Sequence, residues 1–148
     1  RMAQSNRLRI GRVSESHRIY LVTVVCLSRR RVFVNFQAGR CAVQAMKSVA
    51  DSASTMCYVV MPDHVHWLLQ LEQGAELSRV VQKMKSQTTK HLHAQGVSGK
   101  IWQRGFHDHA LRREEDVVGI ARYVVANPLR AGLVGSLQEY PLWDAVWL

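Results

Sequence analysis

Alternation of apolar and polar positions divides this chain into strands and helices that can be placed by residue number. A continuous β-rich apolar run over residues 20–27 predicts a strand that is buried on both faces. Helical spacing over about 36–53 predicts a helix, and two further strands are expected over 55–61 and 64–71. Because proline fixes φ, Pro62-Asp63 suits a tight turn, so these two strands are predicted to form a β-hairpin.

The clearest helix is predicted over residues 77–94, with Gly96 as its stop. At about 100° per residue its apolar side chains form one stripe, which comprises Leu77, Val81, Met84, Thr88 and Leu92. A narrow opposite stripe comprises Arg79, Lys83, Ser86 and Lys90 and contains no acidic residue. The three cations of that stripe are therefore candidates for DNA phosphate contacts, with an ordinary solvated face as the alternative.

Two more elements complete the pattern. A strand is expected over 106–111, and the acidic residues 114–116 favour the start of a helix that ends at Asn127-Pro128. The order βαββαβ is typical of a ferredoxin-like antiparallel sheet with helices on one face. We therefore expect an α+β fold of this type with an additional C-terminal helix. Residues 1–18 are predicted to be a basic arm, 19–135 the domain, and 136–148 a tail that packs on it.

Charge is distributed unevenly along the 148 residues. The chain carries 20 Lys and Arg against 11 Asp and Glu, a formal net charge of +9. Nine of the basic residues, all arginine, lie within the first 40 residues, where Glu15 is the one acid. Such an arm predicts a nucleic-acid partner, with Arg7, Arg9 and Arg12 as contacts, because arginine binds phosphate and guanine in a bidentate way. A solvated tail is the alternative.

The cysteines and the hydropathy of the chain indicate the cellular compartment of the protein. Cys26, Cys41 and Cys57 are odd in number, widely spaced and set in apolar segments, so reduced core thiols are expected. Apolar runs fall far short of the roughly 20 residues that span a bilayer. No secretory leader pattern opens the chain. These patterns predict a cytoplasmic protein that has no membrane partner.

Candidate metal ligands come from His-x-His pairs. His91 and His93 lie in a predicted helix, where side chains two apart diverge by about 200°. His64 and His66 lie in a predicted strand, so both point to one face, away from an apolar opposite face. Two adjacent neutral imidazoles favour a shared divalent metal ion, although strand histidines are also often structural. His109, from a third pair, is a weaker candidate that would support the metal ligands from another strand.

Further sequence features exclude two classes of hydrolase and supply a candidate nucleophile. Leu68 stands where a histidine-triad hydrolase needs a further His, and the helical His-Glu-x-x-His pattern of metalloproteases is absent. Tyr123 and Asn127 lie one turn apart on a boundary face of the last predicted helix. Tyr123 is a candidate nucleophile, and the alternative is a tyrosine that packs with its hydroxyl in water.

Three blocks of sequence, in order, resemble the single-tyrosine HUH transposases, and most of all the REP-associated tyrosine transposases. They are residues 61–69 (MPDHVHWLL), 102–112 (WQRGFHDHALR) and 121–134 (ARYVVANPLRAGLV), within a resemblance that covers about 17–135. The resemblance implies that His64 and His66 are metal ligands, that Asn127 is the third ligand, and that Tyr123 is the catalytic nucleophile.

The resemblance also implies a reaction and a setting. It implies an Mg²⁺ or Mn²⁺ cofactor and the cleavage and rejoining of DNA strands at hairpin-forming repetitive extragenic palindromes, through a 5′-phosphotyrosine intermediate. The expected partner is single-stranded or hairpin DNA, in a bacterial, nucleoid-associated enzyme of DNA transposition and recombination, as a monomer rather than a homodimer. Two alternatives stay open: a non-catalytic DNA hairpin-binding descendant, and a metal-dependent phosphohydrolase for which Tyr123 is dispensable.

Overall fold

The computed structural model describes residues 18–111, 115–133 and 140–145. Its strands are β1 (Ile19–Val25), β2 (Ala53–Met61), β3 (His64–Leu71), β4 (His107–Leu111) and β5 (Trp143–Ala145). Its helices are α2 (Phe36–Ser48), α3 (Leu77–Ala94), α4 (Glu115–Val125) and α5 (Asn127–Arg130), with short 3-10 turns η1 (Leu27–Arg29) and η2 (Val32–Val34). The basic arm predicted over 1–18, with Arg7, Arg9 and Arg12, lies almost wholly outside the described residues.

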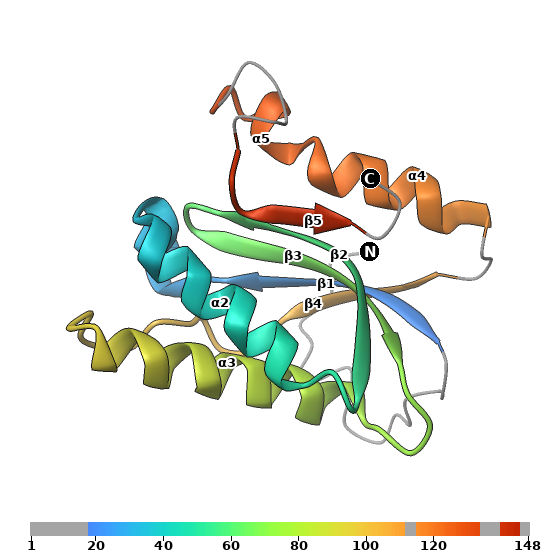
Figure 1. Ribbon diagram of the computed structural model, residues 1–148, viewed down its shortest axis with the longest axis horizontal. Helices are drawn as coiled ribbons and strands as arrows, with labels where there is room; N and C mark the ends of the chain where they lie inside the picture. The colour runs from blue at the N-terminus through green and yellow to red at the C-terminus, as the bar shows by residue number, and fades with distance from the viewer. Residues whose placement is uncertain (1–17, 112–114, 134–139, 146–148) are drawn as a thin grey trace.

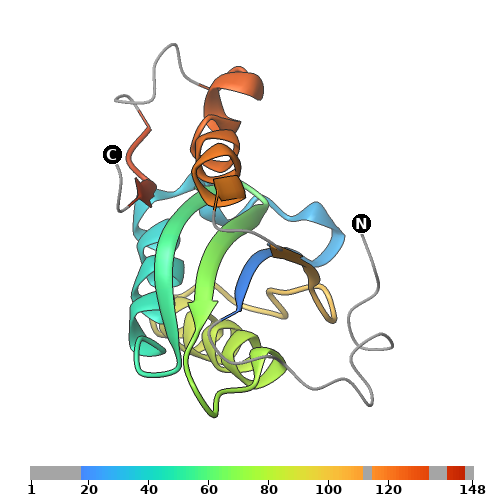
Figure 2. The same cartoon turned by 90° about the vertical axis from the view of Figure 1, so that its right-hand side faces the viewer.

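The strands form one antiparallel sheet in the order β4-β1-β3-β2-β5. Helices α2 and α3 cover one face of this sheet, and α4 lies across the other (Figures 1 and 2). The first four strands and their two connecting helices give the βαββαβ order of a ferredoxin-like fold. The predicted α+β fold with an additional C-terminal helix is confirmed.

The two faces of the sheet contribute to different apolar clusters. The larger cluster joins the inward side chains of β1 and β3 to α2 and α3, and Trp67 lies fully buried within it. The smaller cluster joins Leu68, Val59 and Leu111 to the buried side chains of α4, which are Val117, Ala121, Val124 and Val125. Successive strand residues point to opposite faces, so the adjacent Trp67 and Leu68 serve different layers.

Local chemistry sets several element boundaries. The Asn35 side chain accepts hydrogen bonds from the backbone N–H groups of Gln37 (2.8 Å) and Ala38 (3.2 Å), which caps the start of α2. Gly96 takes a φ of 92° just beyond α3, a conformation that favours glycine and ends the helix. Met61 pairs with His64 across Pro62-Asp63, so the predicted β-hairpin with a two-residue turn is confirmed.

Several boundaries differ from the prediction. The last helix ends at Val125 rather than at Asn127-Pro128, and Asn127 begins a separate helix, α5. Helix α2 ends at Ser48 rather than near Ala53, because turn hydrogen bonds from Ser52 and Ala53 to the Val49 carbonyl return the chain to β2. The first strand ends at Val25, since Leu27 begins the turn η1. Residues 143–145 were predicted only to pack on the domain, whereas they pair with β2 as a fifth strand.

The three cysteines are buried and free, as predicted. Burial raises the pKa of the Cys26 and Cys57 thiols to about 12, which keeps both protonated and unreactive at neutral pH. None of the helices in the described part of the chain has the length and apolar character that a bilayer crossing requires.

Candidate active site

The His64 and His66 side chains lie side by side on the α4 face of the sheet. Val65, Trp67 and Leu69 alternate with them and are fully buried in the larger cluster on the other face. The two imidazole rings meet edge to face, with 4.7 Å between their centroids. The prediction that both histidines share a face opposite an apolar one is therefore confirmed.

Hydrogen bonds hold both imidazoles through the same ring nitrogen. The Nδ1–H of His64 donates to Oδ1 of Asp63 at 2.7 Å. The Nδ1 of His66 is paired with the Thr23 hydroxyl at 2.9 Å. No described residue is hydrogen-bonded to the Nε2 of either ring. Histidines that bind metals are commonly oriented in this way, with one nitrogen held by the protein and the other directed at the ion.

The electrostatics of the pair favour neutral imidazole at His66. Burial, with the nearby charges of His64, Arg130 and Arg29, lowers the pKa of His66 to about 3. Asp63 stays ionised, because hydrogen bonds and charge from His64 and Arg29 outweigh burial and lower its pKa. The Arg29 guanidinium lies 3.3 Å from Oδ2 of Asp63. A neutral His66 has a lone pair available for a metal ion at neutral pH.

Strand pairing extends the site across the sheet. Thr23 pairs with His66 on one side and with His107 on the other, so these three residues form one row. His109 lies in the next row, where it pairs with Leu21, and its side chain is exposed. Of the third His-x-His pair, His107 rather than His109 therefore shares a row with a candidate metal ligand.

Helix α4 brings Tyr123 to this face of the sheet. Its residues Val117, Ala121 and Val124 are buried against the sheet, while Tyr123 points outward and is 59% exposed. The Tyr123 hydroxyl has no hydrogen-bond partner among the described residues. A phenol in this position is open to a large substrate.

Arg130 on α5 fixes the Tyr123 ring. Its guanidinium carbon lies 3.7 Å from the centroid of the ring, and its Nη1 donates a hydrogen bond of 2.6 Å to the Tyr123 carbonyl. Its charge also contributes to lowering the pKa of His66, so Arg130 is electrostatically coupled to the candidate nucleophile and to a candidate metal ligand. Arg130 was missed in the sequence, although it follows Tyr123 by seven residues, just beyond the turn at Ala126 that separates α4 from α5.

Asn127 is the first residue of α5, one turn after Tyr123. Its side-chain amide is half-buried and makes no hydrogen bond to another described residue. Among the described residues no three His, Cys, Asp or Glu side chains converge on a point that could hold a metal ion. Amide oxygens also bind hard divalent cations, so Asn127 remains a candidate for the third ligand.

Asp63, Thr23 and Arg29 were also missed as site residues. Asp63 directly precedes His64 and could have been considered from its position alone. Thr23 and Arg29 reach the histidines only through strand pairing and through the left-handed backbone of Ser28 and Arg29, whose φ angles are 54° and 57°.

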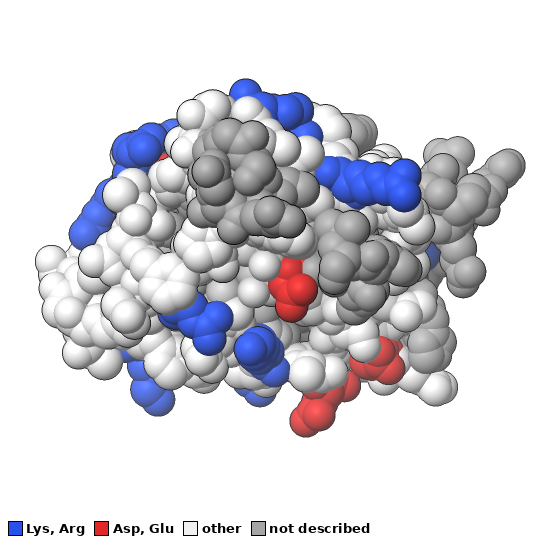
Figure 3. All heavy atoms as spheres, turned by 45° about the horizontal axis from the view of Figure 1, so that its top comes forward, with Lys and Arg blue, Asp and Glu red and all other residues white. Residues whose placement is uncertain are grey.

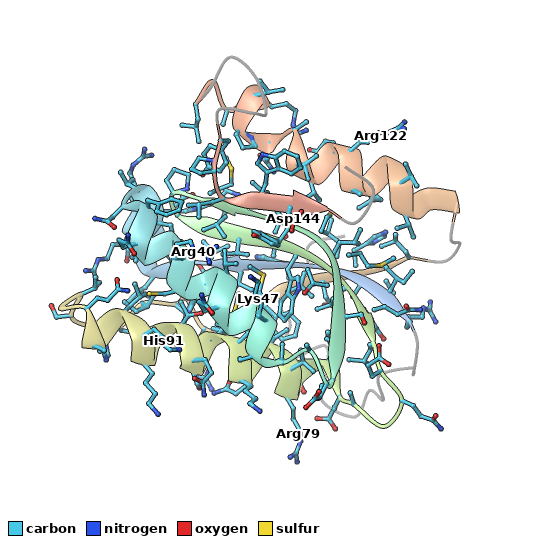
Figure 4. All side chains as sticks on the ribbon, viewed as in Figure 1. Arg40, Lys47, Arg79, His91, Arg122 and Asp144 are labelled. Carbon is cyan, nitrogen blue, oxygen red and sulfur yellow. The ribbon has the colours of Figure 1, made fainter. Side chains whose placement is uncertain are left out.

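The predicted DNA-contacting cations of α3 lie on the other side of the molecule. Arg79, Lys83 and Lys90 are exposed, on a helix that covers the sheet face opposite His64 and His66. Arg79 points away from the body (Figure 4), and its Nε lies 3.7 Å from the carboxylate of Glu76. The cationic stripe of α3 therefore has an acidic residue, Glu76, beside its first member.

The opposite side of the molecule is also cationic. Figure 3 shows Lys and Arg side chains spread around the face on which α4 lies.

Two curated bacterial proteins are similar to this chain. A REP-associated tyrosine transposase of Escherichia coli K12 is 33% identical over 85 residues, which are 57% of this chain and 49% of that protein. A Haemophilus influenzae protein of the same name is 28% identical over 99 residues, 59% of this chain and 56% of that protein. The chain thus matches about half the length of these curated relatives.

A solved structure of a REP-associated tyrosine transposase bound to a REP hairpin superposes with a TM-score of 0.73 at 27% identity. The match covers 89% of this chain and 79% of that one. The family described as "Transposase IS200 like" matches residues 15–127, which include both histidines, Tyr123 and Asn127. The chain belongs to the IS200-like transposase family.

Proposed function

We propose that this chain is a metal-dependent DNA transposase that cleaves and rejoins strands at hairpin-forming palindromes, with Tyr123 as the nucleophile. One observation carries the proposal: two imidazoles are each held through Nδ1, without a described partner at Nε2, on the sheet face over which α4 presents an exposed tyrosine. Family membership supports the same reaction class.

The donor set fits a hard or borderline divalent cation. His64, His66 and Asn127 would hold Mg²⁺ or Mn²⁺ through two imidazole nitrogens and one amide oxygen. When bound, the ion supplies Lewis-acid polarisation of the scissile phosphate. Asp63 and Thr23 keep the two rings oriented toward it, and the low pKa of His66 keeps that ligand unprotonated.

The covalent step takes place at the Tyr123 hydroxyl. Its oxygen attacks the phosphorus, the P–O3′ bond breaks, and the products are a 5′-phosphotyrosine and a strand with a free 3′-OH. The phenolic proton passes to water, and the departing 3′ oxygen takes up a proton. Attack by another 3′-OH on the phosphotyrosine reverses the step and rejoins strands. Arg130 holds the Tyr123 ring and adds positive charge where the phosphate binds.

Hairpin DNA is the proposed partner. The related transposase of known structure was solved with a REP hairpin, and it matches this chain over most of both lengths. The net charge of +9 favours a polyanion. The proposed substrate strand is unpaired where it reaches Tyr123, since a flexible single strand can bend into a site that a stiff duplex cannot enter.

The test is a search for a covalent adduct. The protein is incubated with a labelled library of single-stranded DNA hairpins and Mn²⁺ or Mg²⁺, and adducts that resist denaturant are counted. We expect an adduct with the native chain, and none with Tyr123→Phe, with His64→Ala or with EDTA. Cleavage that persists in Tyr123→Phe would indicate a phosphohydrolase. Hairpin binding without an adduct would indicate a non-catalytic binding protein.

A further inference from the structure

A second candidate site lies on the opposite side of the sheet. A groove of about 1040 Å³ runs between α3 and the segment 99–106. Its floor includes Val81, Ile101 and Trp102, which belong to the larger apolar cluster. His64 and His66 are on the other face, so the sheet separates the groove from the candidate active site.

The described residues that line the groove include several cations and no acid. The cations are Lys85, Lys90, Lys100 and Arg104, together with His93, and none of the described lining residues is Asp or Glu. Hydroxyl and amide groups from α3 lie between these charges. Charged donors interspersed with neutral ones suit the oxygens of successive phosphates.

Lys85 fixes the shape of the groove. Its Nζ donates to the carbonyls of Gln103 and Gly105, both at 2.9 Å. The Trp102 indole N–H donates to the Lys85 carbonyl at 3.1 Å. These bonds tie the segment to α3. Burial, with the nearby charge of Lys100, lowers the pKa of Lys85 to about 8, and an anion bound in the groove would favour its charged form.

The groove lies on a different flank of α3 from the stripe predicted by helical periodicity. Arg79 and Lys83 do not line it, whereas Lys85 and His93 do. Ser86 and Lys90 belong to both sets, and Lys90 is the one cation that they share. The position of residues 99–106 therefore determines which cations of α3 act together.

The aromatic residues of the groove indicate which form of nucleic acid fits. Single-strand sites usually offer exposed rings on which bases stack. Here Trp102 is only 5% exposed and packs against Phe33, while Phe106 is half-buried against the core. A site that presents charge without a stacking surface suits the backbone of a duplex.

We propose that this groove binds the phosphodiester backbone of a double-stranded DNA stem, on the face opposite the cleavage site. The inference rests on the proposed function for the choice of DNA as the partner. One DNA molecule would then contact both faces of the sheet, with its paired stem in the groove and its unpaired strand at Tyr123.

Two double variants with the same charge change test the groove. Lys90→Gln with Arg104→Gln removes two exposed cations from the groove. Arg79→Gln with Lys83→Gln removes two exposed cations from the same side of the molecule but outside the groove. Binding of a fluorescent hairpin, with a stem of about one helical turn, is measured in EDTA at several salt concentrations, so that cleavage plays no part.

We expect the groove variant to bind the hairpin about tenfold more weakly. The slope of the logarithm of the binding constant against the logarithm of salt concentration should also become shallower by nearly two. The matched variant should lose less than about twofold. Equal losses in the two variants would overturn the proposal, since overall charge would then account for binding. An equal effect on an unpaired strand of the same length would also overturn it.

The assay separates the two proposals. If the native chain binds no hairpin at all, both the DNA partner and the groove assignment are wrong. If it binds the hairpin and the groove variant is unimpaired, the groove assignment alone is wrong, and the adduct experiment still decides the chemistry at Tyr123. An unimpaired DNA complex together with lost binding of an acidic protein would assign the groove to that class of partner instead.

Discussion

The two faces of the sheet are built from the same strands but differ in how completely they are covered. On the α2 and α3 face, Val65, Trp67, Leu69 and Leu71 are all fully buried in one large cluster. On the other face, α4 packs mainly over β2 and β5. The side chains of β3 there are His64, His66, Leu68 and Gln70, and only the leucine joins an apolar cluster. One face stabilises the fold, and the partial cover of the other leaves polar groups available for chemistry.

This asymmetry follows from the alternation of side chains along β3. Every second residue is apolar and needs a full covering layer, which two long helices provide. The residues between them include histidines whose ring nitrogens have to be hydrogen-bonded, which Asp63 and Thr23 achieve at their Nδ1 atoms. A helix laid fully over that face would bury both Nε2 atoms without partners.

The largest predicted effect is on stability, and it compares two adjacent leucines that face opposite sides of the sheet. Leu68 and Leu69 are adjacent and fully buried, but they face opposite layers. We expect Leu69→Ala to lower the free energy of unfolding by about 4–5 kcal/mol, and Leu68→Ala by about 2–3 kcal/mol, because the smaller cluster under α4 can relax more easily. Urea denaturation measures both, and an equal or greater loss in Leu68→Ala would contradict the difference.

A smaller effect concerns activity on the open face. Arg130→Ala frees the Tyr123 ring and removes charge beside His66, so adduct formation should slow roughly tenfold while the melting temperature changes little. Arg122→Ala is the matched control, because Arg122 is exposed on α4, the helix that carries Tyr123, and points away from the sheet (Figure 4). A similar slowing in both variants would show that general charge, rather than the contact with Tyr123, matters.

The smallest effect is on pH dependence. His66 has a folded pKa of about 3 against its ordinary value of 6.5, so the unfolded chain binds the additional proton between these values. Its contribution therefore lowers stability as the pH falls below about 6.5 and is absent above it. The drop in urea midpoint from pH 7 to pH 5 should be smaller in His66→Asn than in the native chain. An identical drop would mean that His66 titrates normally.

Much of the fold was predictable because the information is local. The bounds of β3 and α3 follow from periodicity within each segment, and the hairpin follows from Pro62-Asp63. The shared face of His64 and His66 follows from the two-residue repeat of a strand. Strand β5 was not predictable in this way, since its pairing with β2 joins residues more than eighty positions apart.

The site was predictable only in part, for the same reason. His64, His66, Tyr123 and Asn127 were identified from sequence and from family resemblance. Thr23 and Arg29 were not, because a strand pairing and a left-handed turn bring them to their partners. Arg130 was not identified either, although it follows Tyr123 by seven residues. The groove beside α3 was not predictable for a related reason: a helical wheel describes the helix and omits the segment that packs beside it.

The most direct test of the central claim is to map the covalent adduct. Trypsin digestion after reaction with a hairpin and Mn²⁺, followed by mass spectrometry, identifies the peptide that carries the nucleotide. We predict that the peptide is residues 123–130, whose one phenol is Tyr123. A nucleotide found on any other peptide would contradict the account, because the nucleophile would then lie away from the face that His64 and His66 share with α4.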